Sequence, residues 1–189
     1  MENGYYPWGG EFTSCNINSC VAVVLLTIDY TPTKKVAIYG SLKTENIGIE
    51  KIVANIISNP NIRYLIVCGD DIRGHRSGSS LIALNKNGIN NQHRIIDAPG
   101  AIPYIENLNN DAIERFRKQI EIVDLIGIKD KNKIDKIIEE YINRAPPSFG
   151  KPYIAIKMVS KITTLLGDKR ALHSKIVISY LGKIKKRGE

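Results

Sequence analysis

The sequence contains little of what marks several large classes of protein. It has only three cysteines among 189 residues, and such an odd, sparse count gives no sign of a disulfide framework. No apolar run approaches the roughly 20 uncharged residues that a membrane-spanning helix needs; the run at 20–28 is only of strand length. The first residues lack the basic start and apolar segment of a secretory signal peptide. We therefore expect a cytoplasmic protein with no transmembrane segment.

Well-known phosphate-binding and nucleophile motifs are also missing. There is no G-x-G-x-x-G after the first predicted strand and no G-x-x-x-x-G-K-[ST] anywhere. Serines lie near His75, but no G-x-S-x-G turn surrounds them. Cys15 and Cys20 match no strong metal-ligand spacing, so we expect them to be buried or surface thiols.

The positive charge is concentrated at one end of the chain. Residues 1–150 hold 17 Lys/Arg and 17 Asp/Glu, whereas residues 151–189 hold 10 and 2, which accounts for the net charge of +8. We expect a main domain over 1–150, a linker at 145–152 and a basic C-terminal extension over 151–189. The balanced main domain gives no electrostatic support for a nucleic-acid partner. The extension mixes apolar and basic residues, which is compatible with an amphipathic helix in contact with a membrane surface.

Apolar patterning predicts strands that alternate with helices. The continuous apolar run at 20–28 is typical of a strand covered on both faces, and Ile49, Val53 and Ile56 recur with helical spacing. The predicted strands are 20–28, 34–40, 62–68, 93–97 and 121–128, and the predicted helices are 44–58, 79–88, 110–120 and 131–143. Predicted helix caps are Thr44, Ser77, Gly88 and Asp130. This order predicts an α/β fold: a Rossmann-like layered sheet, mostly parallel, with helices on both faces.

In such sheets, ligands bind beyond the carboxyl ends of the strands. Loops 40–46, 69–78 and 98–106 follow predicted strands, and the second of them contains His75 between Gly74 and Arg76. One interpretation of His75 is a surface histidine that makes ordinary hydrogen bonds. The other is a metal ligand, with Asp70 or Asp71 accepting a proton from one ring nitrogen and the second nitrogen left free. A single imidazole holds a bare metal poorly, but it can be the axial ligand of a metal held by a macrocycle.

The stretch H-R-S-G at 75–78 also contains half of the D-x-H-x-x-G pattern of corrinoid proteins, with the acid, Asp71, four residues before the histidine instead of two. Four longer stretches are more specific. They are KTENIGIEKIVANIISNPNIRYLIVCG (43–69), GHRSG (74–78), GAIPYIEN (100–107) and ERFRKQIEIVDLIG (114–127). Together, over about residues 5–150, the chain resembles the A subunit of tetrahydromethanopterin S-methyltransferase from methanogenic archaea.

The resemblance implies a methyl-carrier protein of methanogenesis. In this family the corrinoid takes a methyl group from methyl-tetrahydromethanopterin as cob(I)amide and passes it, as methyl-cob(III)amide, to the thiolate of coenzyme M. Other subunits supply the methyl-pterin and coenzyme M sites, and the reaction is coupled to sodium export. The implied cofactor is a cobamide, either 5-hydroxybenzimidazolylcobamide or cobalamin, with cobalt at its centre.

The resemblance also implies which residues bind the cofactor. The family histidine that ligates cobalt corresponds to His75, as the axial ligand. The other expected cofactor-binding residues come from the three loops: Lys43, Thr44, Glu45, Gly69, Asp70, Asp71, Gly74, Arg76, Ser77, Gly78, Pro99, Gly100, Ala101, Ile102, Pro103 and Tyr104. From the residues alone, helix capping and surface charge are the first explanation of 43–45, a structural turn also explains 98–104, and a solvated side chain explains Arg76 equally well.

One feature departs from the family. Its members usually end in a hydrophobic anchor, whereas Lys or Arg recurs throughout residues 151–189. We therefore expect a soluble homologue without the anchor. The alternative function is a soluble cobamide storage or delivery module, or a corrinoid carrier for a different methyltransferase outside the sodium-pumping complex.

Overall fold

A computed structural model describes residues 5–155, 176–178 and 184–186 of the chain. The chain divides into two compact units, Met1–Met158 and Val159–Glu189. The first unit contains the layered fold and all the predicted site residues.

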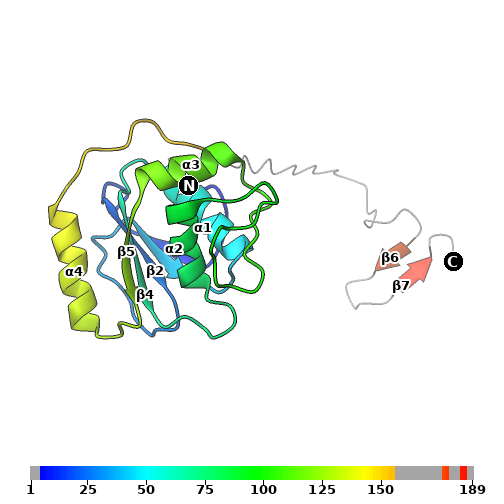
Figure 1. Cartoon of the computed structure of the whole chain (residues 1–189), viewed down its shortest axis with the longest axis horizontal. Coiled ribbons are helices and arrows are strands. Elements are labelled where there is room, and N and C mark those ends of the chain that lie inside the picture. Colours follow the sequence, from blue (N-terminus) through cyan, green and yellow to red (C-terminus); the bar gives the residue numbers. More distant parts are fainter. Residues whose placement is uncertain (1–4, 156–175, 179–183, 187–189) are drawn as a thin grey trace. The chain divides into compact units, whose positions relative to one another are not determined.

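The first unit is built on a five-stranded sheet in the order β1-β3-β2-β4-β5 (Figure 1). Neighbouring strands are parallel except for β1, which pairs antiparallel with β3. The central strands β2 and β4 are the most apolar, as expected for strands covered on both faces. The strands are β1 (Phe12–Ser14), β2 (Val21–Leu25), β3 (Ile38–Ser41), β4 (Tyr64–Gly69) and β5 (Glu121–Ile126).

Helices cover both faces of the sheet, as predicted. The alternation of β4 shows this directly, because Leu65 and Val67 pack in one apolar cluster while Ile66 and Cys68 pack in another. The first cluster contains α1 (Ile47–Ser58), α2 (Ser77–Asn87) and α3 (Asn110–Gln119), and the second contains α4 (Lys131–Asn143). The α/β, Rossmann-like prediction is therefore confirmed.

The helix ends agree with the predicted caps in part. Asp130 caps α4 by accepting a hydrogen bond from the Lys133 N–H at 3.2 Å, and Gly88 follows the end of α2. Thr44 accepts from the N–H of Gly48 at 2.9 Å, but the capping position of α1 is Asn46. Ser77 is the first residue of α2, not its cap.

One prediction about an extended segment is wrong, and one strand was missed. Residues 93–97 are not a strand; they form single bridges, Ile89 with Ile95 and Arg94 with Tyr104. His93 and Asp97 have left-handed backbones, with φ of 61° and 58°, which interrupt an extended run at both ends. Strand β1 was not predicted, because three residues carry too short a pattern to recognise.

The predicted linker at 145–152 packs against the domain. The Phe149 N–H donates to the carbonyl of Pro60 at 2.8 Å, and the Phe149 ring lies beside two guanidinium groups, 5.1 Å from Arg63 and 4.7 Å from Arg115. The segment then continues to Tyr153, whose N–H donates to the carbonyl of Ile57 at 3.1 Å. Figure 1 shows it crossing from the end of α4 to the side of α3. We call residues 145–155 the strap.

The second unit contains two short strands, β6 (Ile176–Ile178) and β7 (Ile184–Lys186), paired antiparallel. The expected amphipathic helix is therefore wrong for these residues, and the remainder of the prediction falls outside the described residues. Within the described part of the chain, no helix combines the length and apolarity needed to cross a bilayer.

The strap yields a stability prediction. Phe149→Ala removes the ring's two cation–π contacts with Arg63 and Arg115, so we expect the free energy of unfolding to fall by about 1–2 kcal/mol. The exposed neighbour offers a matched control, and Ser148→Ala should change stability by less than about 0.5 kcal/mol. Urea unfolding followed by circular dichroism measures both. Equal stability of the two variants would show that the strap does not stabilise the domain.

Candidate functional site

The candidate site lies at the carboxyl edge of the parallel strands, where His75 meets Glu45. The loop that follows β4 carries His75, and the loop that follows β3 carries Glu45 just before α1. The Nδ1 atom of His75 is 3.0 Å from Oε2 of Glu45. The histidine side chain is 58% exposed, whereas the glutamate side chain is 5% exposed. A buried carboxylate thus holds an imidazole that faces solvent.

Glu45 also joins a third loop to this pair. Its Oε1 atom accepts a hydrogen bond from the N–H of Ile102 at 3.1 Å. Next to it, Gly100 is packed so closely that an added Cβ would lie 2.7 Å from the carbonyl oxygen of His75, 2.7 Å from Oγ of Ser80 and 2.9 Å from Cγ of Glu45. Only glycine permits this approach, and the three loops converge on one carboxylate as a result.

The hydrogen bonds around Glu45 determine its ionisation and the tautomer of His75. Burial raises the pKa of Glu45, but hydrogen bonds from its own backbone N–H, from Ile102 and from His75 outweigh burial and lower the pKa overall. The carboxylate is therefore ionised at neutral pH and can only accept hydrogen bonds. Nδ1 of His75 must then carry the proton, because it bonds to an acceptor. In the neutral ring, Nε2 keeps its lone pair and is free to bind a metal.

The predicted proton acceptors for His75 were wrong. The Asp71 carboxylate instead accepts hydrogen bonds from the start of α2. The donors are the Gly78 N–H at 2.7 Å, the Ser79 N–H at 2.8 Å and the Ser79 hydroxyl at 2.6 Å. The start of a helix presents unpaired N–H groups that attract a nearby carboxylate. Asp70 forms an ion pair with Lys129. Both acids shape the loop around His75 without contacting its ring.

The remaining predicted cofactor-binding residues differ in their contacts and in their exposure to solvent. Lys43 pairs with Glu11 at 2.6 Å, and the guanidinium of Arg94 lies 5.4 Å from the centre of the Tyr104 ring. Arg76 is exposed and has a left-handed backbone, with φ of 43°. The other predicted residues fall into two groups by exposure: Gly69, Ser77, Gly78, Gly100 and Pro103 are buried, and Gly74, Pro99, Ala101 and Ile102 are exposed at least in part.

Three isoleucines on the segments around His75 have exposed side chains, and only Ile102 among them was predicted; we call these three residues the apolar fringe. Ile47, Ile72 and Ile102 are 39%, 51% and 59% exposed. Their connection to the pair is direct: Ile102 donates to Glu45, the carbonyl of Ile72 accepts from the His75 N–H at 3.2 Å, and Ile47 begins α1 two residues after Glu45. The sequence feature that could have identified Ile72 is its place as the one apolar residue in the otherwise polar stretch DDIRGHR.

A second buried carboxylate, also missed, fixes the loop that carries Ile102. Glu50 is 1% exposed and accepts hydrogen bonds from the Asn107 N–H and the Asn107 amide, each at 2.7 Å, as well as from the N–H of Glu106. Because Glu50 lies on α1, it ties residues 106–107 to the helix that begins beside Glu45. The site is thus built on a rigid support.

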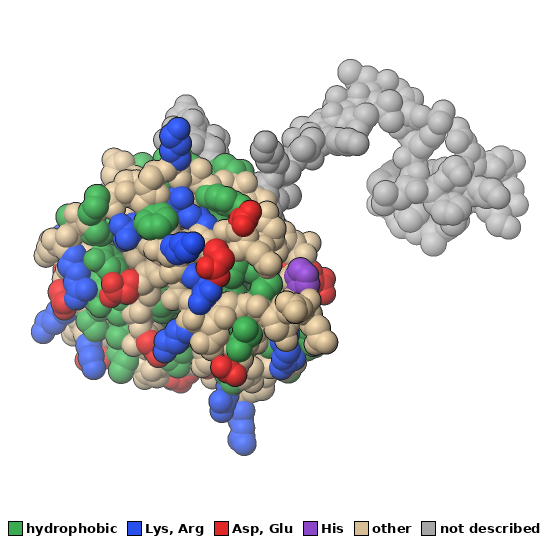
Figure 2. Space-filling model, turned by 45° about the horizontal axis from the view of Figure 1, so that its top comes forward, with side chains coloured by type: hydrophobic (Ala, Val, Ile, Leu, Met, Phe, Trp, Pro, Cys, Tyr) green, Lys and Arg blue, Asp and Glu red, His purple; other side chains and the backbone are tan. Residues whose placement is uncertain are grey.

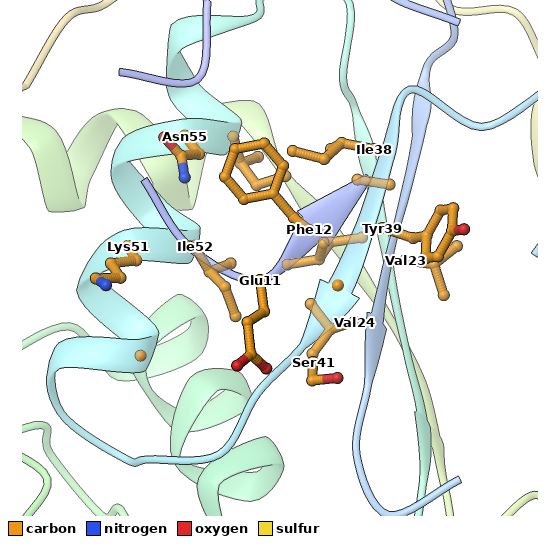
Figure 3. Close-up of a pocket in the computed structure, with 16 residues that line it drawn as sticks. Glu11, Phe12, Val23, Val24, Ile38, Tyr39, Ser41, Lys51, Ile52 and Asn55 are labelled. Atoms are coloured by element: carbon orange, nitrogen blue, oxygen red, sulfur yellow. The ribbon is translucent and has the colours of Figure 1, made fainter. Parts of the chain in front are cut away.

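An apolar cavity of about 100 Å³ lies beside this site but does not include it. It is lined by residues of α1 and of strands β1, β2 and β3, with Phe12, Val24, Ile38 and Ile52 among them (Figure 3). Neither His75 nor Glu45 lines it. In residues 5–155 and the two short strands of the second unit, no three His, Cys, Asp or Glu side chains form a group that could hold a metal ion. Any metal at His75 would therefore need ligands from elsewhere.

Comparison with known proteins identifies the family. Residues 2–164 match the family described as the A subunit of tetrahydromethanopterin S-methyltransferase. The chain belongs to this family.

Individual members agree with the assignment. The chain is 51% identical over 159 residues to the A 1 subunit of tetrahydromethanopterin S-methyltransferase of Methanothermobacter thermautotrophicus, covering 82% of this chain and 67% of the relative. It is 46% identical to the corresponding A subunit of Methanosarcina acetivorans, covering 74% of this chain and 60% of that one. It is also 46% identical to the A subunit of a putative methyltransferase of the same organism, called Mtx. This match covers 75% of this chain and 72% of the relative.

Membership of this family makes the chain a component of a methyltransferase and confirms the resemblance seen in its sequence. His75, Glu45, Gly100 and Ile102 all fall within the matched residues. The geometry adds that these four residues, which come from three separate loops of the chain, meet at one point.

Gly100→Ala tests the convergence of the three loops. The new Cβ would collide with backbone and with Glu45, so we expect a loss of about 1–3 kcal/mol of folding free energy. Gly9→Ala is the control, because a Cβ there would meet nothing within 4 Å. Thermal unfolding compares the two. If both variants match the wild type, the loops do not pack as described.

The lowered pKa of Glu45 predicts a pH dependence. Because the folded-state pKa lies below the unfolded value, the stability contributed by this carboxylate is present above the unfolded pKa and is lost as pH falls through the folded pKa. The stability difference between wild type and Glu45→Gln should therefore be largest near neutral pH and shrink between about pH 5 and about pH 3. Glu106→Gln, at an exposed position of the neighbouring loop, is the control. A difference that stays constant with pH would contradict the assignment.

Proposed function

We propose that this chain binds a cobamide at the carboxyl edge of its sheet, with Nε2 of His75 as the axial ligand, and carries methyl groups from methyl-tetrahydromethanopterin to coenzyme M in methanogenesis. The single observation that carries the proposal is the hydrogen bond between the exposed His75 ring and the buried Glu45 carboxylate.

Such a pair is what a metal-binding histidine requires. Ligating histidines commonly give their second ring N–H to a carboxylate, which fixes the tautomer, orients the ring and makes the ligating nitrogen more basic. Here Glu45 occupies that role, and its own second oxygen is held by Ile102. A histidine that served only as a surface residue would not need a buried ionised partner, since burying a carboxylate is costly.

The surroundings suit a broad, partly apolar macrocycle. The fringe of Ile47, Ile72 and Ile102 offers apolar contact beside His75. Arg76 is exposed next to the histidine, where it can meet an amide or a phosphate. One imidazole is sufficient as a ligand when the metal brings its own equatorial nitrogens, as it does in a macrocycle.

A bound cobamide would supply a cobalt centre able to accept a methyl group from the pterin and release it to a thiolate. The residues of this chain would bind and orient that group: His75 would contribute one nitrogen, Glu45 would hold the ring, and the isoleucines would offer apolar contact. The names of the relatives describe one subunit of a methyltransferase, and in this proposal the pterin and coenzyme M sites belong to partner subunits.

A second candidate is a corrinoid carrier for a different methyltransferase, or a module for cobamide storage and delivery. The observation in its favour is coverage, because the match spans 72% of the Mtx relative and 60% of the tetrahydromethanopterin S-methyltransferase relative from the same organism. Methylation of the bound cobamide by a methyl-pterin and its partner protein separates the candidates, since a storage module would remain unmethylated.

We propose no nucleic-acid partner for the first unit. Charges of both signs are interspersed over the face shown in Figure 2, in agreement with the balanced charge of residues 1–150. Contact of the basic extension with an anionic membrane surface remains a prediction, as does a cytoplasmic location.

Reconstitution with hydroxocobalamin tests the proposal. The full chain, freed of excess cofactor by gel filtration, should retain the red chromophore, and His75→Ala should shift its absorbance spectrum because the axial nitrogen is lost. His93→Ala is the matched control, since Nδ1 of that imidazole bonds to the carbonyl of Ile105 at 3.1 Å, not to a carboxylate. A colourless wild-type protein, or identical spectra for wild type and His75→Ala, would contradict the proposal.

A further inference from the structure

The apolar cavity beside α1 has no part in the proposed function, because neither His75 nor Glu45 lines it. Its volume is about 100 Å³, and its apolar walls include Val24, Ile38 and Ile52. Protein interiors are normally packed too tightly to leave such a space, and the atoms around a void lose dispersion contacts on one side. An apolar group that entered the cavity would restore those contacts, so the cavity is a candidate binding site.

The walls of the cavity are held in place by the protein alone. Asn55 of α1 binds the N-terminal segment, since its Oδ1 accepts from the Trp8 N–H at 2.9 Å and its Nδ2 donates to the Trp8 carbonyl at 2.7 Å. Strand β1 lies close against β3 because a Cβ on Gly40 would be only 2.6 Å from the carbonyl oxygen of Glu11. A ligand would therefore meet a preformed pocket and would not have to order it.

The cavity also has polar lining residues, and one of them carries an unbalanced charge. Glu11, Ser41 and Lys51 line it, and Figure 3 shows the Glu11 carboxylate and the Ser41 hydroxyl below the apolar side chains. The Glu11 carboxylate is paired with Lys43 at 2.6 Å. Lys51, in contrast, takes part in none of the ion pairs within the described part of the chain. An anionic group is therefore the complement of this lining.

We propose that the cavity binds a small carboxylate with a short, branched apolar chain. The chain would lie beside Phe12 and Ile52, and the carboxylate would pair with the ammonium of Lys51. An engineered cavity of about 150 Å³ in another protein holds benzene, so a cavity of this size suits a group of roughly four carbons. Lysine fits the second role because its stem packs on apolar surface while its ammonium stays in water. Isovalerate is a simple ligand of this class.

Methyl NMR of the full chain, titrated with isovalerate, tests the proposal. The methyl resonances of Val24, Ile38 and Ile52 should shift and saturate, whereas Ile138, which packs on the other face of the sheet, should stay in place. Acetate carries the charge without the apolar chain and should leave all of them unchanged. 3-Methylbutan-1-ol carries the chain without the charge and should bind about three- to fivefold more weakly. Absence of a saturable shift, or equal affinity for acid and alcohol, would overturn the proposal.

Two variants separate the charge from the cavity. Lys51→Met keeps the stem and removes the charge, so isovalerate should bind about three- to fivefold more weakly while the alcohol binds as before. Lys118→Met is the matched control, because Lys118 is exposed on α3 and does not line the cavity. Unchanged isovalerate affinity in Lys51→Met would contradict the pairing.

Val24→Ile adds one carbon inside the cavity and should weaken both ligands at least about threefold, because less space remains for them. Thermal unfolding of this variant should match the wild type, since the added carbon enters empty volume. Isovalerate affinity equal to that of the wild type would place the ligand elsewhere and overturn the proposal.

Discussion

The hydrogen bond between Glu45 and His75 is the contact on which the rest of the site depends. A carboxylate that is almost completely buried would be costly unless donors surrounded it. Here the donors come from its own backbone, from Ile102 and from His75, and together they hold its pKa below the ordinary value despite burial. The same arrangement forces the imidazole proton onto Nδ1 and leaves the lone pair on Nε2 in the neutral ring. The hydrogen bonds that offset the burial of the Glu45 charge therefore also give the exposed His75 ring a defined orientation and tautomer.

The fold explains why these groups meet. In a parallel sheet the carboxyl ends of neighbouring strands open onto one edge, so the loops after β3 and β4 bring Glu45 and His75 together although thirty residues separate them. The third loop reaches the pair because Gly100 has no side chain to keep it away. Behind these tips, Asp71 and Glu50 secure the loops to helices. The architecture thus provides firm bases and exposed tips, which suits the proposed binding of a large cofactor.

Much of the fold could be predicted from the sequence, because buried strands and amphipathic helices impose different apolar periods. The run at 20–28 and the spacing of Ile49, Val53 and Ile56 were sufficient to predict the layers. The sequence also pointed to His75 and, through the family resemblance, to Glu45, Gly100 and Ile102. It could not identify Glu45 as the partner of His75, because Asp70 and Asp71 are nearer in the chain and only the folded loops show that they face Lys129 and the start of α2. The strap was misjudged because its Pro- and Gly-rich composition resembles a linker, while its anchors, Arg63 and Arg115, lie far away in sequence.

The tautomer of His75 is the most direct measurement of the central claim. Nitrogen-15 NMR of the imidazole distinguishes a protonated ring nitrogen from one that carries a lone pair. The account predicts that, in the neutral ring of the wild-type protein, Nδ1 is protonated and Nε2 is not, and that the preference is lost in Glu45→Ala. A neutral His75 protonated at Nε2 would contradict it, because Nε2 would then have no lone pair with which to bind a metal.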